Sequence, residues 1–125
     1  MKPRILVVDD EKSMQELLRN ALSLSGFDVY LAGNDIEFRE QVLAHKPQLI
    51  ILDILLGDKD GIEVYDELIA AKLLSESVPV LIVSALASDQ PSTFPKPGRR
   101  YSLVGKPFDC DDLVHRIEKM TAFQA

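Results

Sequence analysis

Short runs of consecutive apolar residues alternate along this chain with stretches whose apolar residues follow helical spacing. Runs without polar alternation are typical of parallel strands that are covered on both faces. Alternation of such strands with helices predicts βα units and a parallel sheet. The runs that we interpret as strands are Ile5–Val8, Val29–Ala32, Leu49–Leu52, Val80–Val83 and Leu103–Val104.

Four stretches between and after these runs are predicted to be helices, because their apolar residues recur at intervals of three and four. Gly26 is expected to end the first helix, Asn34 or Asp35 to cap the second, and Asp109 to cap the last. Pro47 marks the end of the second helix, and a loop rich in turn formers precedes the third. The apolar residues expected on these helices are Met14, Leu17, Leu18, Ala21 and Leu22 on the first; Phe38, Val42 and Leu43, pointing inward, on the second; Val64, Tyr65, Leu68, Ile69 and Leu73 on the third; and Leu113, Val114 and Ile117, pointing inward, on the last.

The segment between the fourth and fifth strands departs from this pattern. Residues 88–100 carry Pro91, Pro95 and Pro97, three of the seven prolines of the chain. A proline inside a helix removes a hydrogen bond and clashes with the preceding turn, which costs about 3 kcal/mol. We therefore expect an α/β fold of five strands in which the fourth helix region is irregular or shortened.

The composition is that of an ordinary globular domain, with 46% apolar and 27% charged residues among 125. This length predicts a single domain over residues 1–125. The net charge of −6 argues against nucleic-acid binding by this domain. The single cysteine, Cys110, excludes a disulfide framework. With no apolar stretch near the roughly 18 residues of a membrane span, we expect a cytoplasmic protein without membrane contact.

Polar residues follow four of the five predicted strands, either directly or, for the fifth strand, after one glycine. In open parallel α/β sheets, ligands bind beyond the carboxyl ends of the strands, so these side chains are expected to converge. The residues are Asp9 and Asp10 after the first strand, Asp53 after the third, Ser84 after the fourth and Lys106 after the fifth.

These residue types suit phosphoryl chemistry. Three carboxylates drawn together repel one another, and a hard divalent cation such as Mg²⁺ relieves the repulsion because it favours oxygen ligands. One carboxylate can then act as the nucleophile toward a phosphoryl group. The cation and Lys106 would neutralise the phosphoryl oxygens, while Ser84 would donate a hydrogen bond to one of them.

Taken together, four motifs resemble the receiver domain of bacterial two-component response regulators, over about residues 4–120. The resemblance implies a flavodoxin-like, three-layer doubly wound fold with strand order 2-1-3-4-5. The motifs are Val7-Val8-Asp9-Asp10-Glu11, Asp53 with Asp60-Gly61, Ser84-Ala85 and Lys106-Pro107-Phe108.

The resemblance also implies a function: a signalling switch phosphorylated on Asp53 by a histidine of a sensor kinase or phosphotransfer protein. Asp10, Asp53 and the backbone carbonyl of Leu55 would bind Mg²⁺ directly, and Asp9 through water. Ser84 and Lys106 would contact the phosphoryl group and carry the change to a distant surface. The implied partners are a downstream effector or a missing output domain, and a phosphorylation-dependent homodimer. The chain would not be an enzyme, beyond catalysing its own phosphorylation and dephosphorylation.

The sequence departs from the family pattern at three places. Gly57 stands where the loop after Asp53 often has a proline, and the fourth helix region is rich in prolines. Leu103 stands where an aromatic residue is usual, and Tyr101 lies two positions earlier. The last two departures concern the output surface, and leave the phosphorylation site intact.

The sequence disfavours three other functions. An aspartate-nucleophile phosphatase usually has a second aspartate two residues after the nucleophile, where this chain has Leu55. A dinucleotide enzyme is disfavoured because no G-x-G-x-x-G follows the first strand. A receiver that serves only as an interaction module is disfavoured by the complete set of polar residues. His45 and His115 are isolated and expected to be exposed, without a role.

Overall fold

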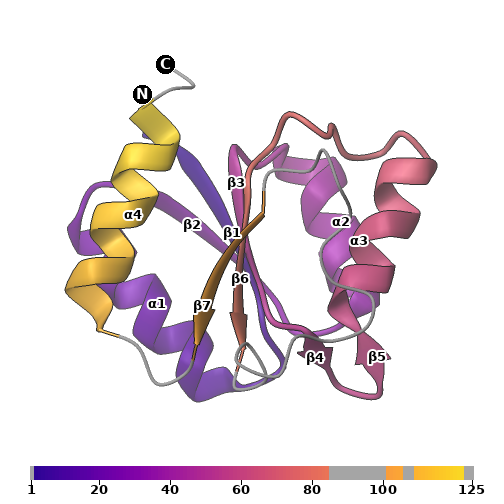
Figure 1. Cartoon of the computed structure of the whole chain (residues 1–125), viewed down its shortest axis with the longest axis horizontal. Helices are drawn as coiled ribbons and strands as arrows, with labels where there is room; N and C mark the ends of the chain where they lie inside the picture. Colours follow the sequence, from indigo (N-terminus) through magenta and orange to yellow (C-terminus); the bar gives the residue numbers. More distant parts are fainter. Residues whose placement is uncertain (1, 85–100, 106–108, 123–125) are drawn as a thin grey trace.

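The computed structural model describes residues 2–84, 101–105 and 109–122, and its centre is a parallel sheet of five strands (Figure 1). The sheet order is β2-β1-β3-β6-β7, which is 2-1-3-4-5 when these five strands are numbered along the chain. The α/β fold class and the strand order are therefore confirmed. The strands are β1 (Arg4–Val8), β2 (Asp28–Ala32), β3 (Leu49–Leu52), β6 (Val80–Ser84) and β7 (Tyr101–Gly105).

Helices cover both faces of the sheet and make three layers (Figure 1). Helices α1 (Lys12–Leu24) and α4 (Cys110–Ala122) lie on one face, and α2 (Asp35–His45) and α3 (Gly61–Ala70) on the other. Alternate residues of β1 pack against the helices on opposite faces of the sheet, because successive side chains of a strand point to opposite faces. Ile5 and Val7 belong to the core that contains residues of α1 and α4, whereas Leu6 and Val8 belong to the core with residues of α2 and α3.

The helix ends follow the signals read from the sequence. At the end of α1 the N–H groups of Gly26 and Phe27 donate to the carbonyls of Ser23 and Leu22, both at 3.1 Å. Gly26 has a φ of +94°, a left-handed conformation that glycine adopts without steric cost. The cap residues expected for α2 and α4 are confirmed, since Asn34 accepts from the Glu37 amide and Asp109 from the Asp111 amide.

Three expectations about single side chains were wrong. Leu43 is 53% exposed, because it lies one position beyond Val42 and is rotated off the face that Phe38 and Val42 share. Leu73, expected on the third helix, lies beyond the end of α3 (Gly61–Ala70). His45 is half-buried, since its ring stacks on Tyr30 with centroids 3.8 Å apart. The other histidine, His115, is exposed as expected.

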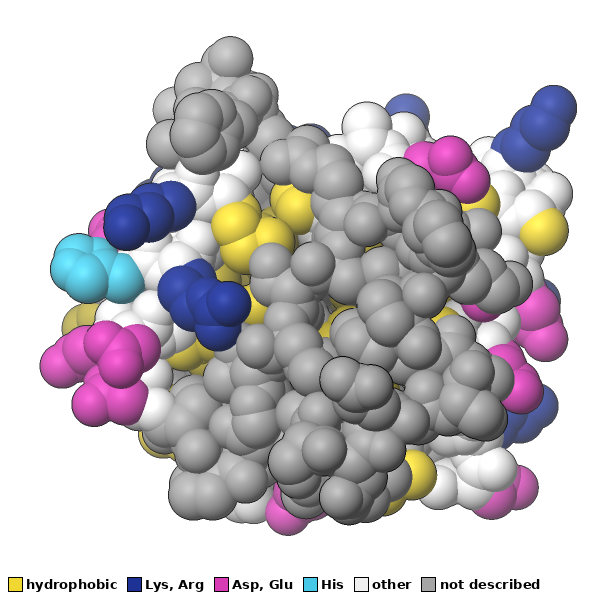
Figure 2. Space-filling model, in the orientation of Figure 1, with side chains coloured by type: hydrophobic (Ala, Val, Ile, Leu, Met, Phe, Trp, Pro, Cys, Tyr) yellow, Lys and Arg dark blue, Asp and Glu magenta, His cyan; other side chains and the backbone are white. Residues whose placement is uncertain are grey.

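Charged side chains of both signs gather over α4, as is usual for the solvent-facing side of a helix (Figure 2). They include Asp111, Asp112, Arg116 and Glu118, all of which are exposed. The outward side of this helix is thus polar, while Leu113 and Ile117 are buried against the sheet.

The loop after β3 contains a small hairpin that was not predicted. Strands β4 (Leu55–Leu56) and β5 (Lys59–Asp60) pair antiparallel around Gly57 and Asp58. Gly57 has a φ of +65°, which is the conformation that glycine supplies at the first position of a two-residue hairpin turn. Strands this short carry no periodicity, so only the turn formers pointed to this region.

The predicted irregularity of residues 88–100 lies outside the described residues. The backbone register of β7 is described: Tyr101 pairs with Val80, and Gly105 pairs with Ser84. Tyr101 therefore starts the strand at the end opposite to Ser84.

Gly61, the first residue of α3, approaches the end of β3 very closely. Its N–H donates to the Ile54 carbonyl at 2.6 Å. A Cβ atom at this position would collide with the backbone carbonyl oxygen of Asp53 and meet Leu52 Cδ1 at 3.1 Å. The first residue of α3 thus packs directly against the backbone of Asp53. Only glycine, which has no Cβ atom, allows the two backbones to approach so closely.

We predict that Gly61→Ala lowers the free energy of unfolding by about 1–3 kcal/mol, because the backbone at Asp53 has to move. Urea unfolding followed by circular dichroism measures the effect. Gly33→Ala is the matched control: its Cβ would meet the ends of two flexible side chains, at 3.3 and 3.4 Å, and the Asp9 carbonyl oxygen only at an ordinary contact distance of 3.9 Å. Equal destabilisation by the two variants would contradict the close approach as the cause.

Candidate functional site

The ends of β1 and β3 place two aspartates side by side. Val8 and Leu52, the last residues of the two strands, are paired in parallel register. The ladder continues one step further, because the Asp53 N–H donates to the Val8 carbonyl at 2.9 Å. On the other side of β1 the Asp9 N–H donates to the Ala32 carbonyl at 3.0 Å. Asp9 and Asp53 therefore leave the sheet at the same level of its carboxyl edge.

Asp10 completes a group of three carboxylates with Asp9 and Asp53. One carboxylate oxygen from each lies within 4.8 Å of the others. Asp9 and Asp53 are only 3% and 7% exposed, whereas Asp10 is exposed. Three negative charges at this distance, two of them buried, disfavour one another unless a cation lies among them. The residues that the sequence predicted for a metal site are thus together, and the cluster could bind a metal ion.

Backbone amides orient each of the three carboxylates. Asp9 Oδ1 accepts from the Glu11 N–H at 2.9 Å, and Asp53 Oδ1 accepts from the Leu55 N–H at 3.2 Å. Both of these donors lie two residues beyond their acceptor. Asp10 Oδ2 instead accepts from the N–H of Gly57, in the hairpin turn, at 3.0 Å. Because such bonds favour the ionised acceptor, the amides offset part of the repulsion.

The remaining predicted residues are only partly within the described part of the chain. Ser84 ends β6 at the same edge of the sheet, with its backbone paired to Gly105. Lys106 follows β7 directly but lies outside the described residues. Leu55 opens the hairpin with its side chain 50% exposed.

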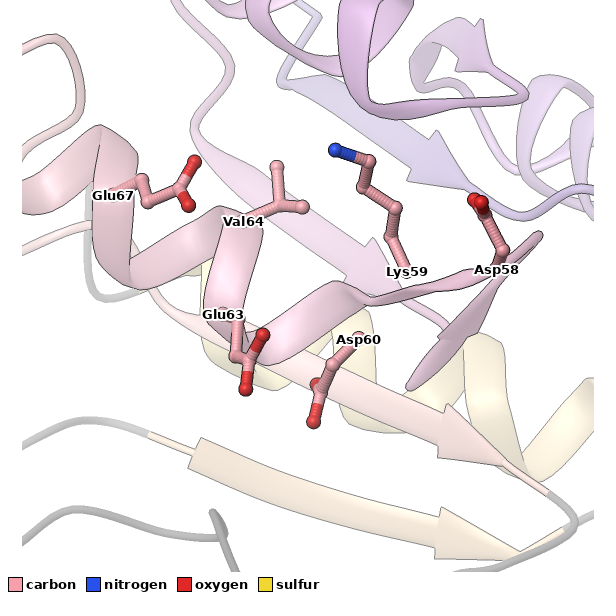
Figure 3. Close-up of a pocket in the computed structure, with 6 residues that line it drawn as sticks. All are labelled: Asp58, Lys59, Asp60, Glu63, Val64 and Glu67. Atoms are coloured by element: carbon pink, nitrogen blue, oxygen red, sulfur yellow. The ribbon is translucent and has the colours of Figure 1, made fainter.

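A shallow cavity of about 260 Å³ lies next to the hairpin, but its side chains do not converge. Lys59 and Val64 lie on one side of the start of α3, and Asp60 and Glu63 on the other (Figure 3). Lys59 pairs with Asp35, at the start of α2, at 3.5 Å. Asp60 caps α3 by accepting from the Ile62 N–H at 2.8 Å. These residues hold the hairpin between two helices and do not form a ligand pocket.

The sequence did not reveal the contacts by which three residues support the carboxylates. Gln15 Nε2 donates to the backbone carbonyl of Asp9 at 2.7 Å. Gly57 supplies the amide for Asp10, and Gly61 seats α3 on the Asp53 backbone. The signal for both glycines was their place in the turn-rich loop, but nothing in the sequence indicated their contacts.

A doubly wound parallel sheet with carboxylates beyond β1 and β3 defines the class of α/β proteins that bind ligands at this edge. Comparison with known families narrows the class. The family model described as "Response regulator receiver domain" matches residues 5–118. The chain therefore belongs to the receiver domain family of two-component response regulators, and is a regulatory domain.

Similar proteins are described as response regulators or as their receiver domains. Response regulator MprA of Mycobacterium leprae is 31% identical over 117 residues, which are 94% of this chain and 50% of that protein. The receiver domain of the Francisella response regulator 1452 is 25% identical, with a TM-score of 0.80 and coverage of 99% and 100% of the two chains. A putative response regulator from Chloroflexus aurantiacus is 26% identical, with a TM-score of 0.82 and coverage of 98% and 99%. These neighbours confirm the flavodoxin-like receiver fold.

The chain spans about half the length of the curated relatives it matches. Within the described residues, the helices are too short or too polar for any of them to cross a membrane.

We predict that Asp10→Asn stabilises the protein in EDTA, by about 0.5–1 kcal/mol, because it removes one of three mutually repelling charges from a partly solvated site. The asparagine oxygen can still accept from the Gly57 amide. Urea unfolding at low ionic strength measures the gain, and added salt should reduce it. The control is Asp28→Asn, at an exposed position that starts β2. A loss of stability in Asp10→Asn would contradict repulsion within the cluster.

Proposed function

We propose that this chain is a phosphorylation-controlled switch in which Asp53 accepts a phosphoryl group with the help of Mg²⁺. The observation that carries the proposal is the position of Asp53: a buried carboxylate at the end of a central strand, grouped with Asp9 and Asp10. The phosphodonor would be a phosphohistidine of a sensor kinase or of a phosphotransfer protein.

The donor set fits a hard divalent cation. Mg²⁺ takes oxygen ligands and is often held by one or two carboxylates with water, and three carboxylates here lie within reach of one ion. Asp10, Asp53 and the carbonyl of Leu55 would hold it directly, and Asp9 through water. When bound, the cation would neutralise charge on the phosphoryl oxygens.

The transfer needs little covalent chemistry from the protein. A carboxylate oxygen of Asp53 attacks the phosphorus, the P–N bond of the donor breaks, and its electron pair stays on the imidazole ring. The Leu55 amide donates to Asp53 Oδ1 and helps to orient the carboxylate for the attack. Lys106 would then neutralise a phosphoryl oxygen and Ser84 would donate to another.

Phosphorylation would change how the domain binds its partner, because Ser84 and Lys106 would move toward the phosphoryl group and alter the surface around them. We place the effector beyond this domain, either as a separate protein or as the output part of a longer chain. We assign no nucleic-acid or membrane contact to residues 1–125. A homodimer that forms on phosphorylation is one output consistent with a domain of this kind.

We predict that Asp53→Asn keeps the fold and abolishes incorporation of phosphate from acetyl phosphate with Mg²⁺, because the amide cannot act as the nucleophile. Mass spectrometry of the intact chain measures the added phosphoryl group. Asp58→Asn is the matched control, at an exposed position in the same hairpin. Full labelling of Asp53→Asn would refute the assignment, and an unlabelled wild-type chain would favour a pure interaction module.

We predict a long-lived phosphorylated state, because the residues two positions after Asp53 and after Ser84 border the approach of the hydrolytic water. The second of them, Leu86, is apolar and lies outside the described residues. The first, Leu55, is apolar and half-exposed, and it cannot orient a water molecule. Leu55→Asn should speed dephosphorylation about threefold to tenfold, by placing the attacking water. Loss of the phosphoryl group over time measures the rate. Leu55→Met, which stays apolar, should not change it, and an unaltered lifetime in Leu55→Asn would contradict the argument.

A further inference from the structure

We propose that Gly57 is a positioning residue for the cation ligand Asp10, acting through the backbone N–H of the hairpin turn. The inference rests on the proposed function, in which Asp10 binds Mg²⁺, and it assigns a role to a position where the family often has proline. The bond from the Gly57 N–H to Asp10 Oδ2, at 3.0 Å, joins residues 47 positions apart in the chain.

Asp10 needs such a donor more than its neighbours do. Asp9 and Asp53 are buried, and each also accepts a bond from an amide two residues further along its own loop. Asp10 is exposed, so its side chain would otherwise be free to turn toward water. The hydrogen bond from Gly57 restricts the Asp10 side chain before Mg²⁺ binds. Less conformational entropy of this side chain is then lost on binding, which favours Mg²⁺ affinity.

The geometry leaves Asp10 available as a ligand. An ionised carboxylate has two oxygens and about four lone-pair sites. The amide uses one site on Oδ2, and the remaining sites can face the cluster, where an oxygen of Asp10 lies within 4.8 Å of oxygens of Asp9 and Asp53. The amide and a cation can therefore be bound by Asp10 at the same time.

The hairpin holds this donor in place. Leu56, next to Gly57, is buried in the core beside α2 and α3. Lys59 pairs with Asp35 at 3.5 Å, and Asp60 caps α3. The turn is thus fixed at both of its ends, and the direction of its N–H is fixed with it.

Glycine is suited to this task and proline is not. The φ of Gly57 is +65°, whereas proline is restricted to about −65° and has no N–H. The space around Gly57 is open, since an added Cβ would have no neighbour within 4 Å. A new side chain at this position would not disturb the packing of its neighbours. The effect of a substitution on Mg²⁺ binding therefore reports on the backbone N–H and on φ.

The test measures Mg²⁺ affinity by isothermal titration calorimetry in a series of full-length variants. Gly57→Pro removes the donor and should weaken Mg²⁺ binding about threefold to tenfold, the value of one hydrogen bond to a charged group in a solvated site. Gly57→Asn keeps the N–H and tolerates the left-handed conformation, so it should restore affinity to within about twofold. Gly57→Ala keeps the N–H at a strained φ and should lie between them.

Two further measurements guard against a merely structural effect. Gly26→Asn, at the other glycine with positive φ in the described part of the chain, is a remote control and should bind Mg²⁺ like the wild type. In ¹⁵N-labelled wild-type protein the Gly57 amide signal should shift during the Mg²⁺ titration with the calorimetric midpoint. If Gly57→Pro does not fold in EDTA, the comparison of Gly57→Ala with Gly57→Asn decides the question.

The outcomes separate this inference from the proposed function. A wild-type chain that binds no Mg²⁺ contradicts the proposed function, and the inference with it. A wild-type chain that binds Mg²⁺, together with a Gly57→Pro variant that binds it equally or more tightly, overturns the inference alone. Equal weakening by Gly57→Asn and Gly57→Pro also overturns it, because the asparagine variant retains the donor.

Discussion

The parallel register between β1 and β3 is the constraint on which the site depends. Because Val8 pairs with Leu52, both strands end at one level and their next residues, Asp9 and Asp53, leave the sheet together. The backbone bond from Asp53 to Val8 extends this pairing one residue beyond the strands. A shift of one residue would turn Asp53 to the other face and separate the cluster. The buried apolar residues on both faces of β1 and β3 hold the register in place.

The fold thus assembles an arrangement that is unfavourable in isolation. Carboxylates that repel one another are tolerated because each accepts a hydrogen bond from a backbone amide, and because the apolar layers around the sheet supply the stability. Functional sites commonly depart from local optimality in this way, with the cost offset elsewhere in the molecule. The same amide hydrogen bonds also orient the carboxylate oxygens. One set of contacts therefore reduces the repulsion between the carboxylates and positions their oxygens for a cation.

The strands, the layers and the cluster could be predicted from the sequence, whereas the contacts that support the cluster could not. Continuous apolar runs that end in polar residues identify parallel strands and the carboxyl edge of the sheet. This signal is carried by consecutive residues, so it can be read from the sequence. The bond between Gly57 and Asp10 joins distant residues through backbone atoms, for which the sequence carries no signature. Leu43 shows the limit of periodicity, since a leucine adjacent to the inward face of α2 proved to be exposed. His45 was misjudged for a related reason: its partner Tyr30 comes from another element.

The sheet order has a consequence for how the chain is made. β1 lies between β2 and β3, and these three strands end at Leu52, so they form a contiguous half-sheet before β6 exists. During synthesis, which runs from the N-terminus at about 5–20 residues per second, this half can pair first. All three carboxylates belong to the segment that ends at Asp53, and α4, the last helix described, packs against α1. The acidic edge therefore belongs to strands that are made before α4, and the layer of α1 and α4 on one face of the sheet is completed only after that helix has been made.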